Sequence, residues 1–488
     1  MREQNNTKGG LRLRPLAMCV ALAFSAGFAG SIDAQPQKSQ LHHRAATPVL
    51  VQREGARRIQ QAREQNGHLL KRAVSPRAPM DVVVSSCDDD GPGTLRDAAA
   101  NAVDGDVIDL TQLECSTITL ASGAISVDVD YLTINGPGPD KLTIDAAQTG
   151  NVINFYGLDS SDYTYGTLSI SGVTMTNGYA PYAGGALWSG DGGSFVLDNV
   201  AVTNSYSHAK YGTGGGISAD GNVTLTNSSV SGNGVMSTKY GGAGGGVYAA
   251  GDLTIIGSTL SGNKAGADAT FVYYYYGYQY GPNPGGGLGG GAASAGNLTI
   301  TNSTISGNES SYGGAVFTNA LAAIQNSTIT LNSASEANNS PGYYYYADAG
   351  GVVATNGNFV IDSSILFGNT TDNPVPSMGI DLAGGGIVAS GGNNLVGDSS
   401  IDLPDDTISD DPHLLPLADN GGPTQTHALP PDSVAIDAGN NTAGLGTDQR
   451  GDGYARVLGA AADIGAYEAE AVTDDVIFKD GFDDDGGS

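Results

Sequence analysis

Three stretches of twelve residues share one pattern: NVTLTNSSVSGN at 222–233, DLTIIGSTLSGN at 252–263 and NLTITNSTISGN at 297–308. Each stretch contains two short runs in which apolar and polar residues alternate, and each run ends at Asn or Gly. Alternation with period two in runs rich in Val, Ile and Thr is typical of strands, whereas Asn and Gly are typical of turns. The pattern therefore predicts pairs of short strands separated by tight corners.

The second half of this pattern recurs along the chain as a seven-residue phrase. The copies are GVTMTNG from Gly172, NVAVTNS from Asn199, NSSVSGN from Asn227, GSTLSGN from Gly257, NSTISGN from Asn302, NSTITLN from Asn326 and the looser DSSILFGN from Asp362. Their starts are 27, 28, 30, 45, 24 and 36 residues apart, so one compact unit carries inserts of variable length. A glycine-rich phrase accompanies the repeat, as GGALW at Gly184, GGGIS at Gly214, GGGVY at Gly244, GGAVF at Gly313 and GGVVA at Gly350.

A repeat of about 24 residues with three short strands per turn and no helical periodicity predicts an all-β fold, the right-handed parallel β-helix, with a cap at each end. The solenoid then stacks equivalent residues about 4.8 Å apart. One recurring position is apolar and predicts an internal stack of Val202, Val230, Leu260, Ile305 and Ile329. Another predicts amides bonded along the axis, at Asn233, Asn263, Asn308 and Asn332. We therefore interpret the Asn-x-Ser/Thr matches here as ladder positions rather than glycosylation sites. The Gly pairs suit corners that need positive φ.

The formal net charge of -29 hides a strong asymmetry along the chain. Residues 1–34 combine a basic start with an apolar stretch and predict a secretory signal peptide, and residues 35–80 are basic and glutamine-rich, as in a weakly structured leader or linker. Residues 81–488 then hold 8 Lys and Arg against 46 Asp and Glu. No run of about 20 apolar residues follows the signal, so we expect no transmembrane segment.

The distribution of positive charge limits the possible partners. Between Arg96 and Arg450 the only cationic residues are Lys141, Lys210, Lys239 and Lys264. Nucleic-acid binding needs clustered Lys and Arg, so it is excluded as the main activity. An acidic polysaccharide is also disfavoured, because it would approach a strongly negative body.

Only Cys87 and Cys115 remain after removal of the signal peptide. An even number of cysteines in an exported chain favours one disulfide, and closing this loop contributes on the order of 3 kcal/mol of stability. Two buried free thiols are the alternative.

The flanks of the repeat resemble known families. CDDDGPGTLRDAAANAVDGDVIDL, from Cys87, resembles the CSLREA-type start of secreted bacterial β-helix proteins, and YLTINGPGPDKLTIDA, from Tyr131, resembles the first turns of polymorphic outer membrane protein-like repeats. GGPTQTHALPPDSVAIDAG from Gly421, GTDQRG from Gly446 and DIGAYE from Asp463 are similar to the choice-of-anchor Q domain. The resemblance implies a β-helix over 81–400, a choice-of-anchor Q-like cap over 401–470 and an acidic tail over 471–488. It also implies export to the extracellular space or the outer surface of a bacterium, and supplies no catalytic residues.

Tyrosines recur at one place in the repeat, between the SGN-like phrase and the glycine cluster. They are Tyr182, Tyr211, Tyr240, Tyr273, Tyr274, Tyr275, Tyr276, Tyr312, Tyr343, Tyr344, Tyr345 and Tyr346. If the turns stack, these side chains lie along one edge of the solenoid. Tyrosine offers a large amphipathic contact area, so the edge predicts adhesive or glycan contact; the alternative is an aromatic stack that only stiffens the inserts.

Two other function classes stay open: a polysaccharide lyase or glycoside hydrolase, and a purely structural envelope or matrix protein. A hydrolase needs paired carboxylates, and we consider Asp191, Asp220, Asp252 and Asp268, but they fall at different repeat positions, and turn chemistry between strands is the favoured explanation. Asp448, Arg450, Asp452 and Asp463 predict a salt-bridged cap rather than a site. No cofactor is indicated; calcium at Asp402, Asp405, Asp406, Asp410 and Asp411 has no supporting motif.

Overall fold

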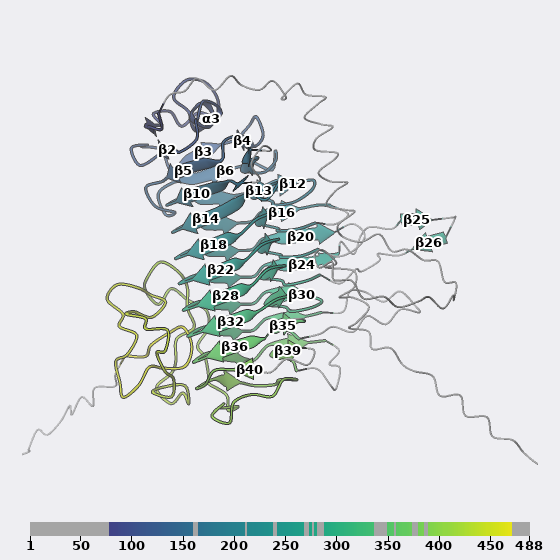
Figure 1. Cartoon of the computed structure of the whole chain (residues 1–488), viewed down its shortest axis with the longest axis vertical. Coiled ribbons are helices and arrows are strands. Elements are labelled where there is room, and N and C mark those ends of the chain that lie inside the picture. The colour runs from purple at the N-terminus through teal and green to yellow at the C-terminus, as the bar shows by residue number, and fades with distance from the viewer. Residues whose placement is uncertain are drawn as a thin grey trace, which may run out of the picture.

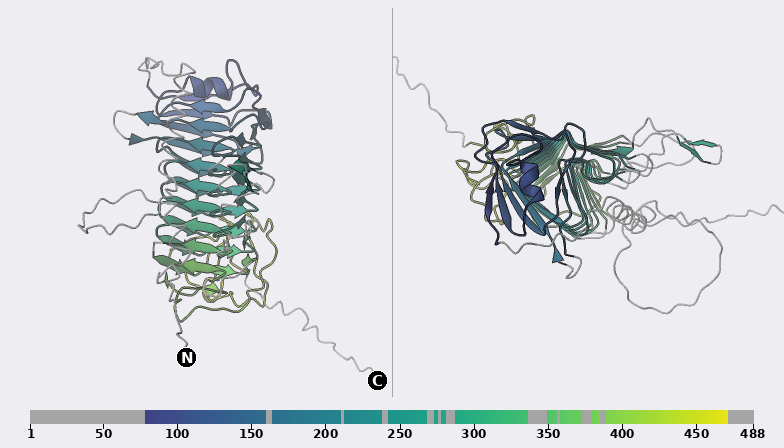
Figure 2. Two further views of the ribbon diagram at one scale, coloured as in Figure 1. Left: turned by 90° about the vertical axis from the view of Figure 1, so that its right-hand side faces the viewer. Right: turned by 90° about the horizontal axis from the view of Figure 1, so that it is seen from above.

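The fold is a right-handed parallel β-helix, seen in a computed structural model (Figure 1). The structure describes residues 78–159, 164–209, 212–237, 242–267, 273–275, 278–280, 287–335, 349–355, 358–372, 379–384 and 389–470. Four parallel sheets run along the solenoid, and we number them 1 to 4 in the order in which the chain passes through them in each turn. Viewed along the axis, the strands of each sheet lie one behind another (Figure 2).

Sheets 1 and 2 are the longest. Sheet 1 consists of β1 (Asp81–Val83), β2 (Asp106–Asp109), β5 (Tyr131–Asn135), β10 (Thr167–Ser171), β14 (Ser194–Asp198), β18 (Val223–Thr226), β22 (Leu253–Ile256), β28 (Leu298–Thr301), β32 (Ala322–Gln325), β36 (Phe359–Asp362) and β40 (Ala389–Ser390). Sheet 2 consists of β3 (Thr117–Thr119), β6 (Thr143–Asp145), β11 (Thr174–Thr176), β15 (Ala201–Thr203), β19 (Ser229–Ser231), β23 (Thr259–Ser261), β29 (Thr304–Ser306), β33 (Thr328–Thr330), β37 (Ile365–Phe367) and β41 (Leu395–Val396).

Sheets 3 and 4 complete each turn. Sheet 3 consists of β12 (Tyr179–Ala180), β16 (Tyr206–Ser207), β20 (Gly234–Ser237), β24 (Lys264–Ala267), β30 (Glu309–Ser310), β34 (Ser333–Ala334) and β38 (Thr370–Thr371). Sheet 4 consists of β4 (Ile125–Val127), β7 (Ile153–Phe155), β13 (Leu187–Ser189), β17 (Ile217–Ala219), β21 (Val247–Ala249), β27 (Ala292–Ser294), β31 (Val316–Thr318), β35 (Val352–Ala354) and β39 (Leu382–Gly384). Two antiparallel hairpins add β8 (Leu158–Asp159) with β9 (Thr164–Tyr165), and β25 (Tyr273–Tyr275) with β26 (Tyr278–Tyr280).

The strand count per turn differs from the sequence-based expectation. We expected three strands, but sheet 3 supplies a fourth of two to four residues directly after the seven-residue phrase. Such short strands are hard to recognise because two residues cannot display an alternation. The last copy of the phrase also begins one residue later than expected, since Gln325 pairs with Asp362 and Ile329 with Leu366.

The predicted internal stack is confirmed. Its five residues, Val202, Val230, Leu260, Ile305 and Ile329, are fully buried and pair in register between consecutive turns. They belong to one apolar core that runs the length of the solenoid. Parallel pairing therefore places each apolar side chain directly on its equivalent in the neighbouring turn.

The predicted asparagine ladder is confirmed at the corner between sheets 2 and 3, and Asn369 extends it. The backbone N–H and the Nδ2 of Asn233 both donate to Oδ1 of Asn263, each at 3.0 Å, and that Nδ2 also donates to the carbonyl of Val202 at 2.9 Å. The same bonds repeat down the ladder to Asn369, whose backbone N–H and Nδ2 donate to the carboxylate of Asp381. The buried amides thus satisfy one another from turn to turn.

A second polar ladder follows the corner between sheets 1 and 2. The buried serines Ser228, Ser258, Ser303, Ser327 and Ser364 each donate Oγ–H to a carbonyl two residues earlier and accept a backbone N–H from the preceding turn. The residue before each serine has positive φ, as at Asn227 (49°) and Asn302 (53°). Asn tolerates this left-handed conformation better than most residues. The glycine-rich phrase supplies the residues with positive φ at the corner between sheets 3 and 4, where Gly214 and Gly244 have φ of 56° and 67°.

The N-terminal end is closed by α3 (Leu95–Ala100), which buries Leu95, Ala98 and Ala99 on the first turns. Thr94 caps the helix by accepting the N–H of Asp97. Cys87 and Cys115 form the predicted disulfide across this cap. Arg96 binds Asp89 at 2.6 Å and also donates to the carbonyls of Gly123 and Ala124, so it ties the cap to the first turns.

The C-terminal segment, which we define as residues 412–469, does more than close the end of the solenoid. Ile408 and Ser399 first extend the last strands through single parallel bridges. The chain then turns back and lies alongside the lower turns, drawn in yellow in Figure 1. Contacts from Gly257 to Asn393 tie it to the outer face of sheet 2, so one flank of the lower solenoid is covered.

We predict that Asn308→Ala lowers the free energy of unfolding by about 3 kcal/mol, because it leaves buried amide donors of Asn263 without their acceptor. Thr224→Ala on the outer face of sheet 1 is the control and should change stability by less than about 0.5 kcal/mol. Thermal and urea unfolding would measure both variants. Equal stabilities for the two would contradict a stabilising role of the ladder.

Candidate functional site

The described structure locates only some of the predicted tyrosine edge. Tyr182 is 66% exposed at the corner between sheets 3 and 4. Tyr312 lies at the equivalent corner lower down but is half-buried in an apolar cluster. Tyr273, Tyr274 and Tyr275 form β25, which pairs with β26 beside the solenoid (Figure 1). Tyr211, Tyr240, Tyr276 and Tyr343 to Tyr346 lie outside the described residues.

An aromatic cluster lies on the upper turns of sheet 3, and of its members the sequence analysis predicted only Tyr182. We define it as Tyr179, Tyr206 and His208 with Tyr182 at the adjoining corner; Tyr179 and Tyr182 are exposed, and Tyr206 and His208 are partly buried. Tyr179 is 41% exposed, pairs in register with Tyr206 and stacks on His208 with ring centroids 6.3 Å apart and planes at 19°. The sequence contained a pattern that could have revealed this pair: Tyr179 and Tyr206 each follow by two residues an asparagine whose backbone has positive φ.

The aromatic cluster is held on rigid backbone. A Cβ at Gly234, which pairs with Tyr206, would lie 3.1 Å from that tyrosine ring, so the glycine leaves room for the ring to lie over the next turn. Tyr179 and Tyr206 therefore stand in register on neighbouring strands of one sheet. A sheet fixes the spacing of such rings more tightly than a loop does.

Other aromatic side chains are structural. Tyr248 is 8% exposed and packs on the outer face of sheet 4 with Ala293 and Phe317. Burial raises its pKa to about 12, and the charge of Asp220 adds to the rise. Tyr248 is not one of the predicted edge tyrosines, but Tyr312, which is one of them, packs against the same cluster.

The carboxylates considered for catalysis occupy turns. Asp220 accepts the N–H of Asp191, and Asp252 accepts the N–H of Asn297. Both bonds link neighbouring turns of the solenoid at the corner between sheets 4 and 1. The protein around Asp220 raises the pKa of that carboxyl to about 6 by disfavouring its charged form, and the nearby charge of Asp191 contributes. Asp268 lies outside the described residues.

The predicted salt-bridged cluster exists within the C-terminal segment, with a different membership. Arg450 pairs with Asp448 at 2.6 Å, and its guanidinium lies 4.0 Å and 3.8 Å from the ring centroids of Tyr454 and Tyr467. Arg456 pairs with Glu468 at 3.0 Å, a pair that the sequence analysis missed.

These buried bonds organise the C-terminal segment rather than form a site. Asp463 joins the network by accepting backbone N–H groups of Asp437 and Ala469, whereas Asp452 is exposed. Both arginines and their carboxylate partners are at most 3% exposed. A substrate would have no access to these charges.

Side chains on the outer face of sheet 2 hold the C-terminal segment. Thr304 donates to Oε1 of Gln449 at 2.6 Å, and Nε2 of that glutamine donates to Thr259 at 2.8 Å. Ser306 bonds Nε2 of the buried His427 at 2.9 Å. Because Nδ1 of this histidine donates to the carbonyl of Leu415, Nε2 of the neutral ring is the acceptor. Burial lowers the pKa of His427.

The aspartates considered for calcium do not converge in the part of the chain that the structure describes. Asp406 accepts the N–H of Asn393, and Asp411 accepts the N–H of His413. Among the described residues no group of three or more His, Cys, Asp or Glu side chains is placed to hold a metal ion. Calcium binding at this run therefore gains no geometric support.

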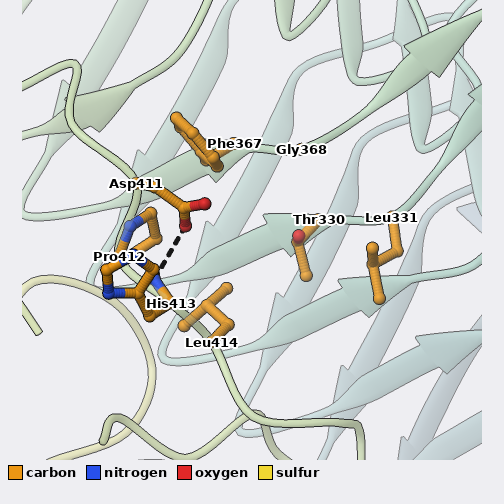
Figure 3. Close-up of a pocket in the computed structure, with 8 residues that line it drawn as sticks. All are labelled: Thr330, Leu331, Phe367, Gly368, Asp411, Pro412, His413 and Leu414. Carbon is orange, nitrogen blue, oxygen red and sulfur yellow. Dashed lines mark hydrogen bonds between the residues drawn. The ribbon is translucent and has the colours of Figure 1, made fainter.

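An open pocket of about 300 Å³ lies between the ends of β33 and β37 and the crossing chain at 411–414 (Figure 3). We call it the corner pocket. Thr330 and Leu331 line one side, and Asp411 and His413 face them from the crossing chain. No sequence pattern indicated this pocket, because its walls come from three separate parts of the chain.

No family model, curated protein or solved structure matches this chain. Within the described ranges, no helix is long and apolar enough to cross a membrane.

We predict that the stability of the protein depends on His427 in mildly acidic solution. Its pKa is lowered in the folded state, so below about pH 6.5 the unfolded chain binds the proton more readily and the free energy of unfolding falls. The loss is at most about 1.4 kcal/mol for each pH unit between 6.5 and the folded-state pKa.

The variant His427→Gln removes this titration while keeping a side chain that hydrogen-bonds. Melting temperatures of both proteins between pH 7.5 and pH 5 would be compared. The wild type should lose stability relative to the variant as the pH falls. Parallel profiles would contradict the assignment of a neutral, buried imidazole.

Proposed function

We propose that this protein is an exported, non-catalytic β-helix that acts in adhesion or carbohydrate contact, outside the cell or on the outer surface of a bacterium. Its partners in this proposal are neutral glycans or other cell-surface components. The observation that carries the proposal is the aromatic cluster, in which Tyr179 and Tyr182 are exposed and Tyr206 and His208 are partly buried, on a body with few cations.

The chemistry of the aromatic cluster favours neutral ligands. Tyrosine rings offer an apolar face and a hydroxyl edge, and two of the rings stand on paired strands of one sheet. The strong negative charge of residues 81–488 repels acidic polymers over long distances. A neutral glycan, which has apolar ring faces and no carboxylates, fits both the aromatic rings and the negative charge of the protein.

Export and surface location are supported by the signal-like residues 1–34 and by the resemblance of the flanking phrases to secreted bacterial β-helix proteins. The Cys87–Cys115 disulfide agrees with an oxidising compartment outside the cytosol. We propose that the C-terminal segment corresponds to a choice-of-anchor Q domain, and that it contributes to display at the surface.

We predict that replacing Tyr179, Tyr182 and Tyr206 together by Ser weakens binding to immobilised neutral oligosaccharides at least tenfold. Loss of stacked rings removes apolar contact, whereas the strand backbone remains. A glycan array read at several protein concentrations would measure the effect. The melting temperature should change by no more than a few degrees, because these side chains are not part of the main core.

The matched control is Tyr131→Ser, which removes a tyrosine that is 47% exposed on sheet 1, away from the aromatic cluster. This variant should bind like the wild type. Two results would contradict the proposal: no neutral glycan is bound by the wild type, or the triple variant loses stability while binding is unchanged. The second result would favour the structural envelope or matrix protein.

A polysaccharide hydrolase is the second candidate, because the exposed residues Asp191 and Asp220 lie on neighbouring turns, where the Asp220 carboxylate accepts the N–H of Asp191, and the pKa of Asp220 is raised to about 6. A carboxyl group that keeps its proton near pH 6 is suited to general acid catalysis. An activity screen on pectin, alginate and neutral glucans would test it by reducing-end release. Turnover that persists through purification and disappears in Asp220→Asn would establish the hydrolase and overturn the non-catalytic proposal.

A further inference from the structure

The corner pocket is lined by a residue in a strained backbone conformation. At this corner between sheets 2 and 3, the equivalent residues have positive φ and are Asn177, Asn204, Gly232, Gly262, Gly307 and Gly368. Leu331 is the exception, with a φ of 57°. Left-handed backbone is unfavourable for a leucine, and its side chain is 59% exposed. Burial in the core therefore does not explain the choice of leucine.

A second residue with positive φ stands across the pocket, in a turn that the Asp411 carboxylate closes. His413, on the crossing chain, has a φ of 52°. Figure 3 shows Asp411 and His413 on one side of the open space and Thr330 and Leu331 on the other. Strained residues concentrate at sites where a ligand is held. A leucine held at positive φ on the wall of a cavity is such a residue.

The walls combine apolar and hydrogen-bonding groups. Phe367, Leu331 and Leu414 supply the apolar surface, and Thr330 adds a hydroxyl. The carboxylate of Asp411 is held in place because its Oδ1 accepts the N–H of His413 at 2.8 Å. A few oriented polar groups within an apolar wall are typical of small-molecule sites, and the volume of about 300 Å³ is at the small end of their range.

We propose that the corner pocket binds one neutral sugar ring. A pyranose has an apolar face for Phe367 and Leu331, and hydroxyls that donate to the carboxylate of Asp411. An anionic sugar would meet the charges of Asp411 and the adjacent Asp410. A wholly apolar ligand would desolvate the Asp411 carboxylate without giving it a donor. The site is separate from the aromatic cluster, so either can fail without the other.

Titration calorimetry of the full chain tests the proposal, with glucose, galactose, mannose and N-acetylglucosamine as the probes. We expect saturable binding of at least one, with a dissociation constant on the order of 1 mM. Galacturonate and arginine are the comparison ligands and should bind at least tenfold more weakly. No saturable binding of any neutral probe, or tighter binding of either comparison ligand, would overturn the proposal.

Substitutions in the wall of the corner pocket test whether the sugar binds there. Asp411→Asn should weaken the best probe about tenfold through loss of a charge-assisted hydrogen bond. Leu331→Asn should also weaken it at least tenfold, while the melting temperature stays the same or rises because asparagine tolerates the left-handed backbone. The triple tyrosine variant should bind the probe like the wild type.

Matched controls are Asp402→Asn, an exposed aspartate outside the pocket, and Leu321→Asn, a leucine that is 38% exposed at another corner. Both should bind the probe like the wild type. If Leu331→Asn lowers the melting temperature and leaves binding intact, Leu331 is structural and the assignment of the pocket is wrong.

Discussion

The hydrogen bonds that buried side chains make between consecutive turns are the constraint on which the rest of the structure depends. Parallel pairing alone would fix the register of neighbouring strands. The corners between the strands must also be aligned from one turn to the next, and the buried side chains at the corners provide this alignment. The amide of Asn263 does this by accepting two N–H groups from Asn233 and donating to Asn308 in the following turn. Inserts of very different length can then leave the solenoid without disturbing its register, and most of the tyrosine-rich segments are such inserts.

Regularity explains which features the sequence could predict. The apolar stack through Val230 and Leu260 and the amide ladder repeat at fixed places, so comparison of the chain with itself reveals them. Sheet 3 stayed hidden because strands such as Glu309–Ser310 are too short to alternate. The exposed pair Tyr179 and Tyr206 obeys the same register, but it repeats in only two turns and so was not distinguished from the loop around it.

Long-range contacts explain the remainder. Thr304 meets Gln449, and Ser306 meets His427, across more than 100 residues of chain. No pattern within a short stretch of sequence predicts hydrogen bonds between residues so far apart in the chain. In the C-terminal segment, Asp448 and Arg450 were predicted together because they are close in sequence, whereas Arg456 and Glu468 come together only through folding. The corner pocket has the same origin, since strands from two turns and the crossing chain all contribute to it.

The asparagine ladder has a direction, and its last member gives that direction a consequence. Every amide in the series both gives and receives a hydrogen bond, so the series on its own could continue without limit. Asp381 receives two bonds from Asn369, and as a carboxylate it has no N–H with which to recruit another amide. Asp381 therefore ends the row of side-chain amides, whereas β40, β41 and the bridge at Ile408 still extend the sheets beyond it. At the end of this row a carboxylate oxygen stands where each asparagine has its amide nitrogen, and this single difference ends the series of amide hydrogen bonds.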